Sequence, residues 1–160
     1  MIYPYLTYCI QIWGATYNKY IDKLFLLQKR IIRIICGVPR LTHTEPLFIE
    51  NNIMKVDDLY VYNVTLFMYK LNLNWLPNIF STFVRFGEIH AINTRHFDLY
   101  LLPPCESDLT YNFIHFLGPK AWNLIASQIN AKCSIGVFKS RLKKYISMNP
   151  HILEKLKKKP

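Results

Sequence analysis

Two sets of residues in this chain have types and spacing that could do chemistry. The first is a pair of adjacent carboxylates, Asp57 and Asp58, of the kind that hold magnesium ions for phosphoryl transfer. The second set is basic, falls on two segments and could bind phosphate groups: Lys23, Lys29, Arg30, Arg33, Lys139, Arg141, Lys143 and Lys144. The first set indicates a metal centre and the second a surface for a polyanion.

The aspartate pair is better explained as the start of a helix. It stands before a long apolar stretch, residues 59–73, in which large side chains recur at intervals of three or four. Aspartate is favoured in a first helical turn because the backbone amides there lack partners. A two-metal site also needs several carboxylates that converge from different strands. We therefore expect no catalytic residue and no metal ion here.

The cysteines and histidines show no spacing typical of metal ligands. The chain contains Cys9, Cys36, Cys105 and Cys133, none of which forms a C-x-x-C pair, together with five histidines. Candidate nucleophiles such as Cys36 and Ser140 have no base or orienting acid that can be placed beside them. We expect free thiols in an intracellular compartment, cytoplasmic or nuclear, with no cofactor.

The N-terminal basic residues lie on a segment with strong helical periodicity, residues 18–36. At about 100° per residue one side is apolar, and this side is expected to face the core: Leu24, Leu27, Ile31, Ile34 and Ile35. The opposite side carries Lys19, Lys23, Lys29, Arg30 and Arg33. Asn18 can cap the start, Gly37 can end the helix and Pro39 prevents its continuation. Only Leu26 does not fit the two-sided pattern.

The charge is concentrated at the two ends of the chain. The 160 residues carry a net charge of +10. Residues 1–44 contain six basic residues (Lys or Arg) and one acidic residue. Residues 45–108 contain four basic and eight acidic residues, and residues 109–160 contain ten basic residues and one acidic residue. This distribution suits nucleic acid or an anionic membrane face, although charge runs often only solvate a helix.

The remaining pattern predicts a mainly α fold with a short irregular or β segment. We expect helices over residues 4–13, 45–51, 59–73 and 120–129, and a last helix that begins at Ser134 or Gly136. Short strands are expected at 97–102 and 111–117, a strand or turn at 83–92, and a turn at Gly118-Pro119. The expected divisions are a helical unit 1–77, a connecting segment 78–110, a strand, turn and basic helix 111–148, and a flexible basic tail 149–160.

Eight short sequence segments follow one another along the chain at residues 2–9, 12–14, 24–30, 33–37, 43–48, 93–95, 118–123 and 138–145. Together, and in this order, they resemble the region that follows the catalytic palm in reverse transcriptases of jockey-like non-LTR retrotransposons. The similarity runs from Ile2 to about Ile146, and its specificity comes from the joint order of the segments.

This resemblance implies a helical, thumb-like bundle that grips template and primer. Its partners would be RNA or an RNA/DNA duplex, with the missing palm or a second copy covering apolar surface near residues 1–13. The catalytic aspartates would lie upstream of Met1, so the chain would be a fragment of an RNA-directed DNA polymerase without activity of its own. Tyr17 or Tyr20 could stack on a base, although burial is the more common fate of such residues. The alternative is a peripheral membrane or scaffold protein that uses basic amphipathic helices and has no integral membrane span.

Overall fold

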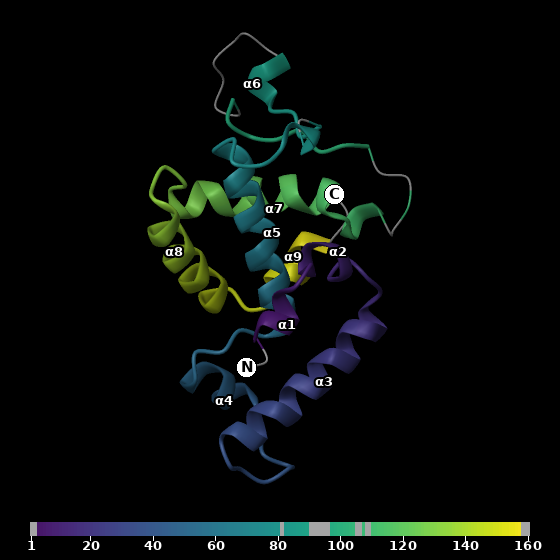
Figure 1. Ribbon diagram of the computed structural model, residues 1–160, viewed down its shortest axis with the longest axis vertical. Helices are drawn as coiled ribbons and strands as arrows, with labels where there is room; N and C mark the ends of the chain where they lie inside the picture. Colours follow the sequence, from purple (N-terminus) through teal and green to yellow (C-terminus); the bar gives the residue numbers. More distant parts are fainter. Residues whose placement is uncertain (1–2, 81, 90–96, 105–106, 108–109, 158–160) are drawn as a thin grey trace.

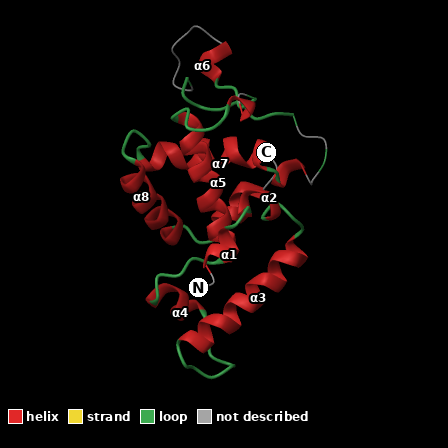
Figure 2. Cartoon of the chain, in the orientation of Figure 1, coloured by secondary structure: helices red, strands yellow, loops and turns green. Residues whose placement is uncertain are grey.

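The computed structural model describes residues 3–80, 82–89, 97–104, 107 and 110–157. In this part of the chain the structure is helical, which confirms the expectation of a mainly α fold (Figures 1 and 2). The elements are α1 (Tyr3–Thr7), α2 (Ile10–Trp13), α3 (Asn18–Ile35), α4 (Glu45–Glu50), α5 (Val56–Asn72), η1 (Asn78–Phe80), α6 (Phe86–Ile89), η2 (Thr110–Asn112), α7 (Ile114–Ile129), α8 (Ile135–Met148) and α9 (Ile152–Lys157).

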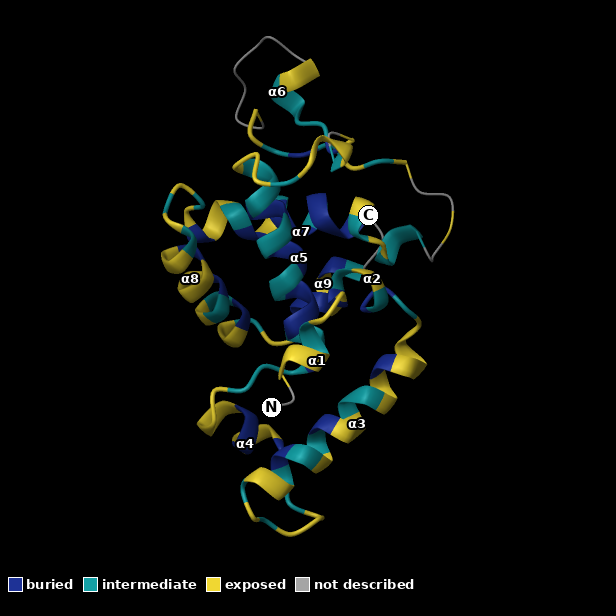
Figure 3. Ribbon diagram, in the orientation of Figure 1, coloured by how far each residue is buried: buried dark blue, intermediate teal, exposed yellow. Residues whose placement is uncertain are grey.

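Helix α5 is the centre of the main core. It packs most extensively against α7 and also touches α1, α2, α3, α8 and α9. Figure 3 shows α5 and α7 as largely buried, with exposed positions concentrated on the surrounding helices. An apolar surface around most of its circumference explains this place, because such a helix can be stable only when neighbours cover it on several sides.

The N-terminal segment differs from the single buried helix expected over residues 4–13. It forms two short helices, separated at Cys9, whose φ of 49° is in the left-handed region. Ile10 is fully buried, but Tyr5 and Tyr8 are 83% and 77% exposed. The left-handed turn rotates α2 relative to α1, so one continuous apolar stripe cannot form and only part of the segment reaches the core.

The segment between α5 and α7 contains no extended strand among its described residues. An isolated antiparallel bridge joins Arg85 to Tyr100, and α6 begins one residue after Arg85. The expected strand at 97–102 is therefore wrong beyond this bridge. Residues 84–87 make backbone hydrogen bonds with one edge of this segment, including Leu101 N–H to the carbonyl oxygen of Val84 at 2.9 Å. On the other edge, the side-chain amide of Asn123 bonds both the N–H and the C=O of Tyr100, at 2.9 and 2.8 Å. The expectation for 83–92 extends outside the described residues at 90–92.

The expected strand at 111–117 and turn at Gly118-Pro119 are also wrong. Residues 110–112 form η2, and Gly118 and Pro119 lie buried inside α7. A Cβ at Gly118 would lie 2.9 Å from the sulfur of Met68 on α5. Because Gly118 has no side chain, α5 and α7 can approach each other closely at this point. Helix α7 therefore continues through the Gly-Pro pair.

Helix α8 begins at Ile135 after Ser134, as the sequence predicts, and it buries Phe138, Leu142 and Ile146. The expectation of a mobile tail is wrong for residues 152–157. These residues form α9, which inserts Ile152, Leu153 and Leu156 into the main core. The many lysines of this segment favoured the interpretation as a tail. Its apolar residues are nevertheless spaced three or four positions apart, which is sufficient for one buried face of a short helix.

Helices α3 and α4 form a smaller second core at one end of the molecule (Figure 1). It contains Ile32 of α3 with Leu47 and Phe48 of α4, and Phe25 packs against it. The predicted inward face of α3 is therefore wrong. Its buried positions are Ile21, Gln28 and Ile32, whereas Leu27, Ile34 and Ile35 are 50%, 77% and 61% exposed. Contacts with α4 and α5 have selected a different side of the helix.

Candidate nucleic-acid interface

The two ends of α3 are set by local sequence. Tyr17, in an extended conformation, is the residue that precedes the first turn, so the cap lies one position before the expected Asn18. The side chain of Asn18 instead accepts a hydrogen bond from the Lys157 ammonium at 2.9 Å. At the other end Gly37 adopts a φ of 62°, which a residue without a Cβ adopts at little cost. The expected glycine stop is confirmed.

The four basic residues predicted on α3 fall into two groups. Lys23 and Arg30 are exposed and, with exposed Lys19, lie on the outer side of the helix. Lys29 and Arg33 are half-buried. The Lys29 ammonium lies 4.3 Å from the ring centroid of Phe25, which is a favourable cation–π distance.

Arg33 has a structural contact within its own chain. Its Nε donates to the carbonyl oxygen of Thr42 at 2.9 Å, which joins the end of α3 to the loop that leads to α4. A guanidinium held in this way still carries its charge, but one of its donors is committed. The exposed cations of α3 are therefore Lys19, whose ammonium lies 4.9 Å from the ring centroid of Tyr20, together with Lys23 and Arg30.

The second basic set lies on α8. Lys139, Arg141 and Lys144 are exposed, and Lys143 is half-buried. The Lys143 ammonium donates to the carbonyl oxygen of Asn52 at 3.1 Å, which connects α8 to the loop after α4. Arg141 reaches the carbonyl oxygen of Asn130 at 3.4 Å, at the C-terminal end of α7. Cations are favoured at such an end because its carbonyls carry partial negative charge.

A cleft of about 750 Å³ is lined by residues of α3, α4, α5, α8 and α9. Lys29 and Lys143 both line it, so the cleft brings one member of each basic set to the same space. However, its walls also carry five carboxylates, which is one more than the number of lysines: Asp22, Glu45, Asp57, Asp58 and Glu154 against Lys29, Lys55, Lys143 and Lys157. The structure therefore does not join the two basic sets into one continuous positive track through the cleft.

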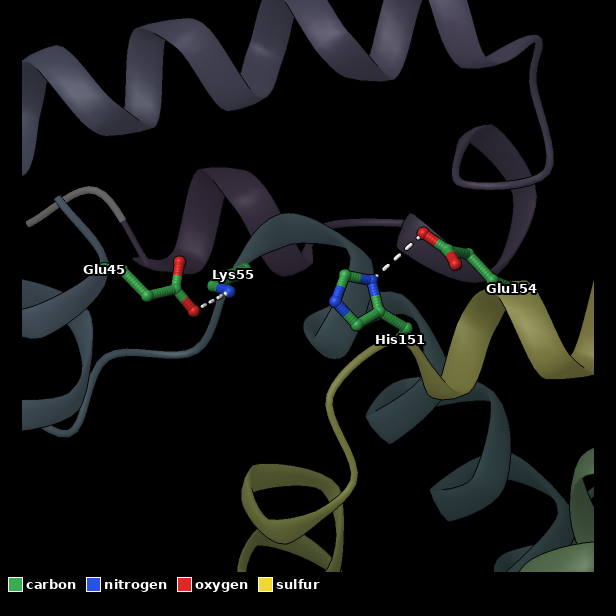
Figure 4. A network of polar contacts seen from close by, with 4 residues as sticks. All are labelled: Glu45, Lys55, His151 and Glu154. Atoms are coloured by element: carbon green, nitrogen blue, oxygen red, sulfur yellow. Dashed lines mark hydrogen bonds and ion pairs between the residues drawn. The ribbon is translucent and has the colours of Figure 1, made fainter. Parts of the chain in front are cut away.

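An ion pair and a hydrogen-bonded histidine–carboxylate contact lie at this cleft (Figure 4). The Lys55 ammonium lies 2.5 Å from a carboxylate oxygen of Glu45, and His151 lies 3.0 Å from Glu154. Burial raises the pKa of Asp57, and the nearby carboxylates Asp22 and Glu154 add to this effect, although Lys157 opposes it. Burial likewise lowers the pKa of Lys157. The cleft wall is thus a compensated mixture of charges.

Asp57 and Asp58 occupy the first turn of α5, as the helix-start interpretation predicts. The described residues contain no group of three or more His, Cys, Asp or Glu side chains placed to hold a metal ion. Three cysteines of this part of the chain, Cys9, Cys36 and Cys133, are free thiols.

The aromatic candidates are more accessible than expected. Tyr17 and Tyr20 are 61% and 51% exposed. Both line a groove of about 470 Å³, whose walls also include Ile12, Trp13, Leu24 and Phe113. The groove is thus a mainly apolar surface at the start of α3, beside the basic side of the helix.

Sequence reasoning missed the residue that fixes how α3 lies on α5. Gln28 is 6% exposed, its amide nitrogen donates to the carbonyl oxygen of Met54 at 2.8 Å, and its amide oxygen accepts from the N–H of Val56 at 3.0 Å. The sequence spacing could have identified this residue: Gln28 follows Ile21 by seven residues and precedes Ile32 by four, which places the three side chains on one face of the helix. Such a polar residue in an apolar row needs a partner when it is buried.

No protein-family model, curated protein or solved structure matches this chain. None of the described helices is both long enough and apolar enough to cross a membrane.

Proposed function

We propose that this chain binds the phosphate backbone of RNA or an RNA/DNA duplex without sequence preference, as a non-catalytic, thumb-like piece of a non-LTR reverse transcriptase. The observation that carries the binding proposal is the pair of exposed basic rows, Lys23 and Arg30 on α3 with Lys139, Arg141 and Lys144 on α8, in a chain of net charge +10. The ancestry rests on the ordered segments of the sequence.

The mechanism requires each helix to use one side for the protein and another for phosphates. Ile32 and Gln28 of α3 face the body, whereas Lys23 and Arg30 are exposed. Similarly, Phe138 and Leu142 of α8 are buried, and the basic residues around them reach solvent. Lysine and arginine bound to phosphates release condensed counterions, so the binding is strong at low salt and insensitive to base sequence.

The acid-rich cleft restricts where the backbone can lie. A phosphate that approaches the cleft meets Asp22 and Glu154 as well as Lys29, so repulsion cancels much of the attraction. We therefore assign Lys29 and Lys143, which line the cleft, a smaller share of the binding than the five exposed cations of the two rows. Arg33 also receives a smaller share, because its Nε is committed to Thr42.

Fluorescence anisotropy with a labelled RNA/DNA duplex tests this proposal. We expect dissociation constants of about 10⁻⁴ to 10⁻⁶ M near physiological salt and tighter binding at low salt. If all five exposed cations contact phosphates, the logarithm of the association constant should fall with the logarithm of salt concentration with a slope of about −4.5. Absence of salt-dependent binding at low ionic strength would refute it.

A pair of double variants separates a defined surface from general charge attraction. The variant Lys23→Gln with Arg30→Gln should reduce the slope by about 2, since each lost phosphate contact contributes nearly one unit. The control, Lys132→Gln with Lys155→Gln, removes the same charge from exposed residues outside both rows. Equal losses in the two variants would contradict the assigned rows.

The ancestry can be tested separately from the binding. An upstream reading frame that encodes an x-x-Asp-Asp hairpin would support it, and an unrelated upstream exon would contradict it. With template, primer and magnesium, we expect no extension by this chain. Stronger sedimentation with anionic vesicles than binding to duplex would favour the peripheral membrane alternative.

A further inference from the structure

Helix α3 presents an apolar seam that the rest of the described chain covers only in part. The seam consists of Tyr20, Leu24, Leu27, Ile31 and Ile34. Tyr20, Leu27 and Ile34 are 51%, 50% and 77% exposed, and Leu24 and Ile31 are half-buried. Four of the five seam residues belong to the side of α3 that amphipathic periodicity predicts to be buried. In the fold, this apolar side of the helix is largely accessible instead.

The spacing of the seam is that of a coiled coil. Successive members are separated by four, three, four and three residues, which corresponds to positions d, a, d, a and d of a heptad. Ile31 at a and Leu27 at d are residue types that pack well as knobs into the holes of a facing helix. A membrane surface requires a broad apolar face rather than a narrow seam with this alternation.

The groove at the start of α3 continues this seam. Tyr20 and Leu24 belong to both, and the groove is closed on its other side by Ile12 and Phe113. An apolar helix placed along α3 would therefore rest in a groove at one end and on an exposed row at the other. This arrangement resembles the way in which amphipathic helices bind hydrophobic grooves.

The charges beside the seam specify the partner. Lys23 and Arg30 occupy the two g positions that flank it, and both are exposed. On the other flank, the e positions Ile21 and Gln28 are buried against the body of the molecule, and the e position Ile35 is 61% exposed. Along the first two of these positions, a partner helix thus meets basic side chains on one flank and protein on the other.

A second copy of this chain fits poorly. An antiparallel pair would place g positions opposite g positions and bring the two basic flanks together. A parallel pair would place Lys23 opposite the buried Gln28 of the second copy, and none of the e positions of α3, Ile21, Gln28 and Ile35, carries an acid that could pair with Lys23 or Arg30. We propose that α3 docks an amphipathic helix of a partner protein that carries apolar residues at heptad spacing and glutamate or aspartate on its flank. This inference goes beyond the proposed function and does not depend on nucleic-acid binding.

A synthetic peptide can test this surface directly. The probe is a fluorescein-labelled peptide of three heptads with Leu at a and d and Glu at e and g, which repels itself at neutral pH. Two control peptides carry Lys in place of Glu, or Ser in place of Leu. We expect anisotropy to show binding of the full chain to the Leu/Glu peptide and to neither control.

Variants of α3 provide a matched comparison. Leu27→Gln with Ile34→Gln should weaken peptide binding roughly tenfold or more, because two exposed seam side chains lose their buried contacts. Leu26→Gln should have little effect, since Leu26 is 55% exposed but lies off the seam. All these substitutions are neutral, so duplex binding should remain unchanged.

Three results would overturn the inference: equal binding of the Glu and Lys peptides, equal losses from the on-seam and off-seam variants, or no peptide binding. In the last case, α3-dependent binding to phosphatidylserine vesicles would assign the seam to a membrane, and a seam-dependent dimer in analytical ultracentrifugation would assign it to a second copy.

Discussion

Gln28 offers the sharpest test of how α3 is held. Replacement by Ala removes both the donor to Met54 and the acceptor for the Val56 N–H. Val56 is the first residue of α5, and the preceding Lys55 makes no side-chain cap hydrogen bond. The glutamine of one helix therefore satisfies an amide that the start of another helix leaves without an intrahelical partner.

The expected cost follows from the burial of the two backbone groups. Val56 is 1% exposed, so its unpaired N–H cannot turn to water and should cost about 1 to 3 kcal/mol. Met54 is half-buried, and its carbonyl oxygen can recover part of its hydration. With the loss of packing, we expect Gln28→Ala to lower the free energy of unfolding by about 2 to 4 kcal/mol. The corresponding fall in Tm is about 6 to 12 °C.

Urea denaturation followed by circular dichroism measures this change, and hydrogen exchange at the Val56 amide locates it. Gln128→Ala is the matched control, because Gln128 lies exposed on α7. Gln28→Leu retains most of the side-chain volume without either polar atom, and we expect it to be destabilised almost as much as the Ala variant. The reasoning is refuted if Gln28→Leu is as stable as the natural chain, or if Gln28→Ala loses no more than the control.

Three further predictions test other parts of the fold. Gly14→Ala should destabilise the chain by about 1 to 3 kcal/mol, since its Cβ would lie 2.3 Å from the Tyr60 ring. Gly136→Ala should instead stabilise α8 by about 0.5 to 1 kcal/mol, because a Cβ there meets nothing within 4 Å. Thermal melts of both variants measure this difference in stability. Asn123→Ala should accelerate limited proteolysis within residues 97–104, because its amide holds the backbone of Tyr100, and an unchanged cleavage rate would contradict this role. Burial raises the pKa of Asp57 above its ordinary value of 3.8. The stability associated with the protonated carboxyl is therefore complete below pH 3.8 and is lost as the pH rises through the folded-state pKa. Asp57→Asn should raise the urea midpoint at pH 7, and an equal gain at pH 3 would count against burial of the charge as the cause.

Local sequence signals located several helix boundaries correctly. Gly37 lies directly after the end of α3 in the left-handed conformation, and Thr44 and Ser134 directly precede α4 and α8, although neither makes a side-chain cap hydrogen bond. The start of α5 at the aspartate pair was predictable for the same reason. These signals depend on a few neighbouring residues, and the fold does not need to be known for them to be interpreted.

The errors arose where distant contacts decided the structure. A Gly-Pro pair usually turns the chain, but packing of Gly118 against Met68 keeps it within α7. Alternating side chains at 111–117 resemble a strand, but the residues from Ile114 onward gain more by joining the apolar face of α7. In the basic tail, three buried residues of α9 outweigh the surrounding lysines.

The candidate site shows the same division. The sequence establishes that α3 is amphipathic, that its basic and apolar residues occupy different sides and that a second basic row lies on α8, because these properties follow from residue spacing and helical geometry. It does not establish which side of α3 faces inward. Tertiary contacts make that choice: α4 and α5 cover Ile21, Gln28 and Ile32, and they leave the Leu27 and Ile34 side exposed beside Lys23 and Arg30. Burial depends on where neighbouring elements meet a helix, and periodicity contains no information on that position.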